Sequence, residues 1–429
     1  MKDRLRALFC DHLSIMRGKY LPNSKIGDDS TRFCRSVFGT HYDRDLLNAP
    51  GAMVYDGLPD MELVWRHDDI RDSWDASTKI VLGDLYDDAG EPLSLCPRGA
   101  LKRAVADWQA MGLTPKVGIE LEAFALQADE NGRLEPYDAP GGVVYGTGPF
   151  ADPQRFNDRI WEVADQMGFA LEMITAEFDT PQFEYVLTFD DAVKAVDDIV
   201  LFRLMAREIA LEYGIVLTFM PKPIAEGGGS GMHVNFSFVD ATGGNALSSG
   251  PRGGPEHMND LARGCLGGLI HHHKGLAGLI APTANSYMRL QPGSLSGFWQ
   301  NWGGDHRNVT TRISSEGGAK ARLEHRMADA SSNPYTTTAA VLQAALLGVK
   351  NGHGLPPMET GDGFEKTDAK VGTAMDLQGA VKDLESDTAL TQAVGAELVA
   401  NHVFMKQKEV RKTRDLEGEA LRDFYVYFV

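Results

Sequence analysis

The sequence predicts an α+β fold with a large sheet that packs on one face and borders a polar cleft on the other. Several segments place apolar residues at every second position, which is typical of strands with one buried face. Other segments repeat apolar residues at helical spacing, and the chain contains no internal repeat. Hydrophobic residues make up 43% and charged residues 24% of the chain, which is a globular composition. Because 429 residues exceed one ordinary domain, we expect two.

The first expected domain covers residues 1–98 and the second covers residues 99–429. A charged amphipathic helix is expected for MKDRLRALFCDHL, and short strands are expected for ELVW and STKIVLGDLYD. The boundary is placed just before an amphipathic helix expected for CPRGALKRAVADWQAMGLTP, with Pro97 near its start and Gly112 at its end. The last fifty residues are expected to form helices that cap the second domain.

Charge and cysteine usage limit the possible partners. The formal net charge is −18, so nucleic acid is not expected as a partner. The four cysteines have neither metal-ligand nor redox spacing, as is common in reduced chains. The sequence contains no apolar signal core and no apolar run of the ~20 residues needed to cross a bilayer. We therefore expect a soluble cytoplasmic protein with no membrane partner.

The stretch VGIELEAFAL, from Val117 to Leu126, places two acidic residues on one face of an expected strand. Residues two apart in a strand point to the same side, so Glu120 and Glu122 stand next to each other. Like charges this close repel, and buried carboxylates need a partner. Either this face is exposed to solvent, or a divalent cation such as magnesium or manganese lies against it.

Three further segments combine polar and apolar positions in a similar way. Their polar residues are His233, Asn235 and Ser237 in GSGMHVNFSF, Arg322, Glu324 and Arg326 in ARLEHRMAD, and Glu177 and Glu184 in TAEFDTPQFEYVL. Each has an ordinary explanation when taken alone, such as a hydrogen-bonded core histidine or a surface ion pair. Four such segments together indicate one polar cleft with carboxylate and imidazole ligands for a hard cation.

The run HHH at 271–273 is a weak candidate for a metal site. Adjacent residues on a helix point in different directions, so three consecutive histidines make a poor chelate. We therefore expect these side chains to lie on a helix surface.

The order and spacing of these motifs from about residue 117 to residue 335 resemble the glutamine synthetase family. The family's first acidic strand is matched by VGIELEAF, and its segment with two metal-binding glutamates by EFDTPQFE. Its glutamate- and ATP-site signature is similar to FMPKPIAEGGGSGMHVNFS, and its arginine-bearing segments to APTANSYMRLQPGS, RNVTTRI and ARLEHRMADASSNPY. The resemblance implies a small N-terminal β-grasp domain and a large catalytic domain whose open antiparallel sheet forms the active-site funnel.

The resemblance also implies a role for each polar residue in an ATP-dependent ligase. One divalent cation, magnesium or manganese, would be bound by Glu122, Glu177 and Glu184, and another, next to ATP, by Glu120, His233 and Glu324. Arg289, Arg326 and the Gly229 backbone would hold the glutamate substrate. Arg307 and Arg312 would balance the negative charge of the transferred phosphoryl group. ATP would contact Glu172, Asn235, Ser237 and Arg322. Two or three cations are expected in all. Adjacent glutamates on one strand are then tolerable because each faces a different cation.

The chain departs from ordinary glutamine synthetases where the amine would bind. The flap glutamate that helps bind and deprotonate ammonium is replaced by Leu295, and aromatic residues including Trp299 follow. Gly228 stands where an asparagine is usual, and Asp179 lies in the metal loop. These departures resemble the branch that makes γ-glutamyl amides from alkylamines or polyamines. We expect a small alkylamine, methylamine first, with Leu295 and Trp299 as the pocket wall and Asp179 as the base that accepts the amine proton.

Other interpretations fit the same residues. Trp299 and its aromatic neighbours could pack in the core or at a subunit contact. The chain could also be a γ-glutamylpolyamine synthetase, an ammonia-dependent glutamine synthetase or a non-catalytic metabolite sensor, although a sensor has no need of the full set of ligands. The resemblance further implies a homo-oligomer of stacked hexameric rings, in which the N-terminal domain of one subunit closes the active site of the next.

Overall fold

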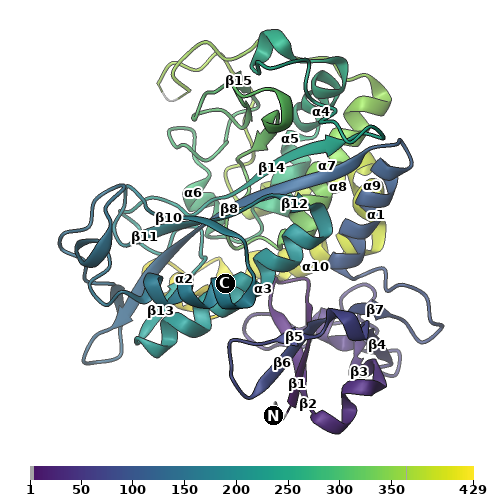
Figure 1. Cartoon of the computed structure of the whole chain (residues 1–429), viewed down its shortest axis with the longest axis vertical. Helices are drawn as coiled ribbons and strands as arrows, with labels where there is room; N and C mark the ends of the chain where they lie inside the picture. Colours follow the sequence, from purple (N-terminus) through teal and green to yellow (C-terminus); the bar gives the residue numbers. More distant parts are fainter. Residues whose placement is uncertain (1–3, 364) are drawn as a thin grey trace.

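The computed structural model describes residues 4–363 and 365–429. The N-terminal part contains a four-stranded sheet in the order β2-β1-β6-β5 and a three-stranded sheet in the order β3-β4-β7. It lies at the bottom of Figure 1. Its strands are β1 (Arg4–Cys10), β2 (Met16–Pro22), β3 (Ser30–Cys34), β4 (Asp60–Val64), β5 (Arg71–Asp72), β6 (Thr78–Leu82) and β7 (Asp84–Tyr86). The strands expected at ELVW and STKIVLGDLYD are thus confirmed.

The opening segment is strand β1, so the expected helix is wrong for the residues that are described; Met1 to Asp3 lie outside them. Leu5, Ala7 and Phe9 of β1 are buried at 0 to 2% exposure. The strand pairs antiparallel with β2 and parallel with β6, so its backbone groups are paired on both edges. A short segment of mixed charged and apolar residues fits either period, and here the neighbouring strands decide the outcome.

The larger part of the chain is built on a ten-stranded sheet with the order β10-β11-β8-β14-β17-β16-β15, while β9, β12 and β13 also pair with β8. Its strands are β8 (Thr114–Ala128), β9 (Leu134–Pro136), β10 (Leu171–Ala176), β11 (Gln182–Leu187), β12 (Asp190–Asp191), β13 (Ile215–Thr218), β14 (Met232–Val239), β15 (Trp302–Gly304), β16 (Thr311–Ile313) and β17 (Leu323–His325). The pairs are antiparallel except β15 with β16, which are parallel. The expected antiparallel sheet is confirmed apart from that pair.

Helices pack against this sheet, and the C-terminal end of the chain is helical. They are α1 (Pro97–Gln109), α2 (Phe156–Met167), α3 (Ala192–Glu212), α4 (Asp260–His271), α5 (His273–Ile280), α6 (Ser286–Arg289), α7 (Pro334–Asn351), α8 (Leu377–Ser386), α9 (Thr388–Val394), α10 (Ala396–Thr413) and α11 (Gly418–Tyr425). Short 3-10 helices are η1 (Asn23–Asp28), η2 (Arg35–Gly39), η3 (His67–Asp69), η4 (Gly148–Phe150), η5 (Pro255–His257) and η6 (Gly318–Lys320). The expected helix after Cys96 and the C-terminal helices are confirmed.

Among the described residues, no helix is both long and apolar enough to span a bilayer.

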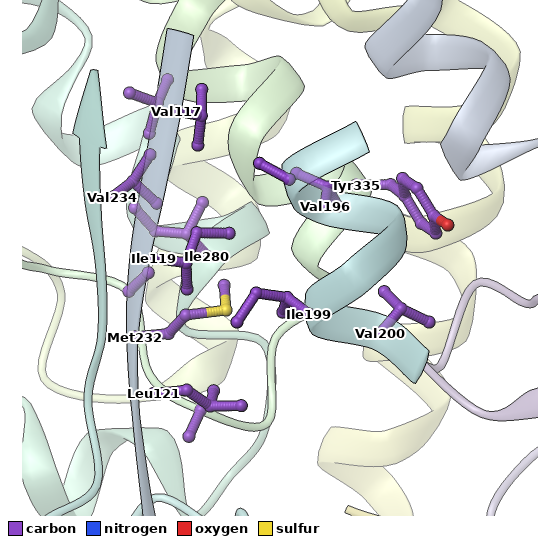
Figure 2. Close-up of a cluster of buried hydrophobic side chains, with 14 of the residues drawn as sticks. Val117, Ile119, Leu121, Val196, Ile199, Val200, Met232, Val234, Ile280 and Tyr335 are labelled. Carbon is purple, nitrogen blue, oxygen red and sulfur yellow. The ribbon is translucent and has the colours of Figure 1, made fainter. Parts of the chain in front are cut away.

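One face of β8 is buried against helices, and this burial fixes the direction of its polar residues. Figure 2 shows Val117, Ile119 and Leu121 on the side of β8 that faces the helix carrying Val196 and Ile199. Burying one such side chain stabilises the fold by ~1.5–3 kcal/mol. A one-residue shift in register would put glutamates into this apolar layer, so the alternation holds the acidic side chains on the opposite face.

The histidine run at 271–273 lies where α4 ends and α5 begins. His272 is 2% exposed and His273 is fully buried, whereas His271 is exposed. The expected helix surface is therefore wrong for two of the three residues. The change of direction between α4 and α5 turns these rings inward, and Nε2 of His273 donates a hydrogen bond to the Phe298 carbonyl at 3.0 Å.

Candidate active site

The register of β8 with its two neighbours assembles the expected metal ligands. Glu122 of β8 is opposite Glu184 of β11, and Glu120 is opposite His233 of β14. Residues directly opposite in antiparallel strands have Cβ atoms roughly 4.5–5.5 Å apart. Each of these two opposed pairs joins positions more than sixty residues apart in the sequence. The sequence pattern fixes the face, and the strand pairing brings these residues into one cluster.

One group of possible cation ligands combines Glu120, Glu184 and His233, each of which offers a ligand atom within 4.8 Å of those of the other two. Nδ1 of His233 lies 3.0 Å from Oε2 of Glu120, and Nδ2 of Asn235 donates to Oε1 of the same carboxylate at 3.1 Å. Buried Glu324 comes within 3.6 Å of the His233 ring. Glu184, expected to share a cation with Glu122 and Glu177, therefore also lies beside the other expected site.

The pKa values of these carboxylates indicate where a bound cation would offset negative charge. Burial, together with the charges of Glu120, Glu122 and Glu177, raises the pKa of Glu184 to about 9. Burial and Glu122 also raise the pKa of Glu177. Burial acts to raise the pKa of Glu120 as well, but the hydrogen bond and charge of His233, together with Arg326 and Asn235, outweigh it and lower that pKa to about 2. The excess negative charge around Glu184 fits a hard divalent cation with oxygen ligands.

Glu122 is held in place by neutral donors. The Gly231 backbone N–H donates to its Oε2 at 2.7 Å, and Gln182 Nε2 donates to the same oxygen at 3.2 Å. Gln182 also donates to the Gly229 carbonyl at 3.1 Å. Sequence analysis missed Gln182. The signal was present, because Gln182 precedes Glu184 by two positions on a strand and so shares its face.

Two of the expected arginines converge on Glu324. Arg326 forms an ion pair with Glu324 through Nη1, which also lies 3.4 Å from Nδ1 of His233. Arg312 Nε lies 3.1 Å from the other oxygen of Glu324 and 3.6 Å from Asp305. The Nε atom of Arg326 is buried without a hydrogen-bond partner among the described residues, so one donor of this guanidinium is left for a bound anion.

Arg289 is buried next to the glycine-rich loop. Its Nη1 donates to the Met327 carbonyl at 2.9 Å, and a Cβ atom on Gly229 would lie 2.5 Å from its Cγ. Only glycine lets the backbone approach this closely, as expected for a residue whose backbone adjoins the glutamate site. Arg307 is exposed on the loop between β15 and β16, whereas Arg312 is half-buried on β16.

The residues expected to contact ATP are divided between two parts of the sheet. Arg322 donates through Nε to Asn235 Oδ1 at 3.3 Å and through Nη1 to Glu316 Oε2 at 2.7 Å. Ser237 is half-buried two positions beyond Asn235 on β14. Glu172 is exposed on the edge strand β10, which β11 and β8 separate from β14. The sheet therefore groups three of the four residues and leaves Glu172 apart.

The segment expected to bind the amine contains both buried and accessible side chains. Phe298 and Trp302 are each 6% exposed and belong to the core, which agrees with the packing interpretation for these two residues. Trp299 is half-buried, packs edge-to-face on Phe298 at 5.0 Å between ring centres, and donates through Nε1 to the Pro292 carbonyl at 3.0 Å. Leu295 is 44% exposed. Leu295 and Trp299 thus stay candidates for the pocket wall.

Asp179 and Gly228, the other two departures in the sequence, lie against each other. A Cβ atom on Gly228 would lie 2.5 Å from Oδ2 of Asp179. The aspartate carboxylate therefore occupies the space that a side chain at position 228 would need. Because Gly228 precedes Gly229, the carboxylate of Asp179 adjoins the loop expected to bind glutamate.

Comparison with known proteins fits this arrangement. Residues 94–424 match the glutamine synthetase catalytic domain. The chain belongs to the glutamine synthetase family. It is 29% identical to the glutamine synthetase of Pyrococcus abyssi over 425 residues, covering 94% of this chain and 89% of the relative. It is 29% identical to a glutamate–isopropylamine ligase of a Pseudomonas species over 366 residues, covering 81% of this chain and 78% of that one.

Solved structures extend this similarity to the N-terminal part of the chain. The ligand-free structure of GmaS has a TM-score of 0.84 and 26% identity, and the match covers 99% of this chain and 96% of GmaS. The predicted fold class is thereby confirmed, including the small N-terminal β-rich part. Enzymes of the glutamine synthetase family are ATP-dependent carbon–nitrogen ligases that use divalent metals, and this protein is an ATP-dependent ligase of that class.

Proposed function

We propose that this enzyme joins the γ-carboxylate of L-glutamate to a small alkylamine, methylamine first, through a γ-glutamyl phosphate intermediate. The main support is the segment from Ser286 to Asn301, which contains no aspartate or glutamate and presents accessible Leu295 where ammonium-using relatives carry a flap glutamate. Similarity to GmaS, a γ-glutamylmethylamide synthetase, and to a glutamate–isopropylamine ligase favours the same class of nucleophile.

Activation of glutamate needs positive charge near three anionic groups. Two or three magnesium or manganese ions would be held by Glu120, Glu122, Glu177, Glu184, His233 and Glu324. These ions would supply positive charge against the phosphates of ATP. Arg289 and Arg326 would bind the glutamate carboxylates beside Gly229, and Arg307 and Arg312 would balance the transferred phosphoryl group. ATP would contact Glu172, Asn235, Ser237 and Arg322.

The amine must lose a proton to attack. An alkylammonium ion has a pKa close to that of lysine, ~10.4, so it arrives charged at neutral pH. Contact of its carbon with Leu295 and Trp299 disfavours the charged form. The carboxylate of Asp179 accepts the proton, the amine nitrogen bonds to the acyl carbon of γ-glutamyl phosphate, and inorganic phosphate leaves.

A panel of amines with glutamate, ATP and magnesium or manganese tests this proposal. Phosphate release should be fastest, by kcat/KM, with methylamine or another short alkylamine, and mass spectrometry should identify the γ-glutamyl amide. A higher kcat/KM for ammonium would identify an ammonia-dependent glutamine synthetase, and one for a polyamine would identify a γ-glutamylpolyamine synthetase. If no amine stimulates phosphate release, the catalytic proposal fails and a sensor becomes the better interpretation.

We also propose that residues 1–98 form a separate domain that closes the active site of a neighbouring subunit in stacked hexameric rings. An apolar cluster built from Leu5 to Cys96, joined by Met405, supports the division. Exposed Tyr55 and Phe178, at 83% and 72%, are surface suited to a subunit contact. Light scattering during size-exclusion chromatography should give a large cyclic assembly. A fully active monomer would rule out the shared site.

A further inference from the structure

A cluster of three histidines lies outside the active site, at the corner where α4, α5 and the end of α7 meet. His271 and His272 come from the α4–α5 junction, and His353 follows the end of α7. A ring nitrogen of each lies within 4.8 Å of a ring nitrogen of the other two. The His271 and His353 rings are stacked, with centres 3.8 Å apart and planes within 7°. The two histidines next to each other in sequence thus gain a third partner from more than eighty positions further on.

Two ring nitrogens in this cluster are buried without a hydrogen-bond partner among the described residues. They are Nε2 of His272 and Nε2 of His353. His272 is 2% exposed, so bulk solvent does not reach its ring. A buried polar atom with no partner is unfavourable, and a ligand that accepted both lone pairs would remove this cost.

The other nitrogen of His272 is held by a carboxylate. Nδ1 of His272 donates to Oδ2 of Asp387 at 2.7 Å, while Oδ1 of Asp387 accepts from the Leu390 N–H at 3.1 Å and caps α9. This fixes the His272 tautomer with its proton on Nδ1, so the lone pair is on Nε2. Metal-binding histidines commonly donate their second nitrogen to a carboxylate in this way, which orients the ring and increases its basicity.

We propose that His271, His272 and His353 bind one zinc-class transition-metal ion, with Asp387 orienting His272 and water completing the coordination. Three imidazoles and an open position are an established zinc ligand set. Zinc–nitrogen distances of ~2.0–2.1 Å place tetrahedral ligand atoms about 3.4 Å apart. The ring nitrogens must therefore move together, and the stacked His271 and His353 rings must rotate out of their parallel arrangement to aim their lone pairs at one ion. Exposed His271 and half-buried His353, which follows Gly352 with its φ of +65°, have the freedom to do so.

Ligand chemistry keeps this site separate from the catalytic cations. The active site offers mainly carboxylate oxygens, which suit magnesium and manganese, whereas three imidazoles suit zinc, cobalt or nickel. The proposed ion would fasten α4, α5, α7 and the start of α9 to one another. The α4–α5 junction also contacts the segment from Ser286 to Asn301, which is expected to bind the amine. His273 donates a hydrogen bond to the Phe298 carbonyl, and Gln300 donates one to the Ile270 carbonyl at 2.7 Å.

The test uses full-length enzyme, freed of metal with a chelator and then supplied with excess Mg²⁺ so that hard-cation sites are filled. Co²⁺ serves as a spectroscopic probe and Zn²⁺ as the competitor. We expect one Co²⁺ per chain with visible bands of a nitrogen-ligated tetrahedral ion, displaced by Zn²⁺, and a rise in melting temperature on Zn²⁺ addition. His353→Ala and the exposed His271→Ala should each weaken binding at least tenfold, and Asp387→Asn by about 10–100-fold.

Two controls separate this site from other metal binding. His67→Ala removes an exposed histidine on η3 and should leave Co²⁺ binding unchanged. Glu184→Gln alters the active-site cluster and should also leave it unchanged. Co²⁺ bands that persist in both His271→Ala and His353→Ala, or that disappear in Glu184→Gln, would overturn the proposal. If His353→Ala does not fold, judged by circular dichroism, the exposed His271→Ala still decides.

Discussion

The expected metal cluster and the expected amine pocket are built from different kinds of structure. Glu120, Glu122 and His233 stand on long paired strands whose opposite face is buried, so backbone pairing sets their spacing. Leu295 and Trp299 lie on a segment between α6 and β15 with few regular elements, and Leu295 is 44% exposed. One region is fixed by the sheet, and the other depends on a loop supported by individual hydrogen bonds.

This difference suggests that the sheet activates glutamate and that the loop selects the amine. Activation of glutamate by ATP needs several charged groups held at fixed distances, which a sheet provides. The choice of nucleophile needs only a few side chains near the acyl carbon, and a loop can change these without disturbing the sheet. Substitutions in the first region should reduce activity with every amine alike. Substitutions in the second should change the ratio between amines.

The largest effect is expected for Glu122→Ala. It removes a carboxylate that Gly231 and Gln182 hold toward the expected cation, so phosphate release should be abolished with every amine. Steady-state phosphate release measures this. The matched control is Glu130→Ala, which changes an exposed glutamate in the turn between β8 and β9 and should keep wild-type kcat. Near-normal turnover of Glu122→Ala would remove Glu122 from the metal site.

Asp179→Asn tests the proposed base. Loss of a positioned base lowers turnover by roughly 10²–10⁴-fold, so kcat with methylamine should fall in that range while KM for glutamate changes little. Gly228→Ala should act in the same direction but less strongly, because its Cβ would displace the Asp179 carboxylate from 2.5 Å away. A fully active Asp179→Asn enzyme places the base elsewhere, including on a neighbouring subunit.

The stability of the metal-free enzyme should depend on pH through Glu184. Its pKa is about 9 in the folded protein, against ~4.3 when unfolded. Between these values the folded state keeps a proton that the unfolded state has lost. The free energy of unfolding should therefore fall as pH rises from about 5 to about 8, by up to ~1.4 kcal/mol per pH unit. Glu120, with its pKa lowered to about 2, has the opposite effect, confined to pH below ~4.3.

Urea unfolding across this pH range, with chelator or with Mg²⁺, measures the slope. Mg²⁺ should replace the proton and flatten it, and Glu184→Gln should flatten it without metal. A slope that is equally steep in Glu184→Gln and in the wild type would show that another group is responsible.

The smallest expected effect is a change of amine preference in Leu295→Glu. A carboxylate at this position would stabilise ammonium and remove apolar contact with an alkyl group, so the ratio of kcat/KM for ammonium to that for methylamine should rise roughly tenfold. Glutamate KM should stay close to wild type because Arg289 and Arg326 are untouched. An unchanged ratio would take Leu295 out of the pocket wall.

The sequence alone determined the features that depend on local periodicity. Alternation along VGIELEAFAL and GSGMHVNFSF predicted the strands and the faces of Glu120, Glu122 and His233, because every second side chain of a strand points the same way. The motif order predicted the family and hence the fold class. Local periodicity was misleading where the segment was short: β1 was expected as a helix, since a few charged and apolar residues fit both periods.

Only the tertiary structure decided which distant residues meet. Strand register set Glu184 opposite Glu122, and chain packing put the Asp179 carboxylate into the space beside Gly228. His272 was expected on a surface, yet the turn between α4 and α5 buries it next to His353. Such contacts join positions many residues apart and depend on how whole elements pack, so the spacing of residues along one segment cannot predict them.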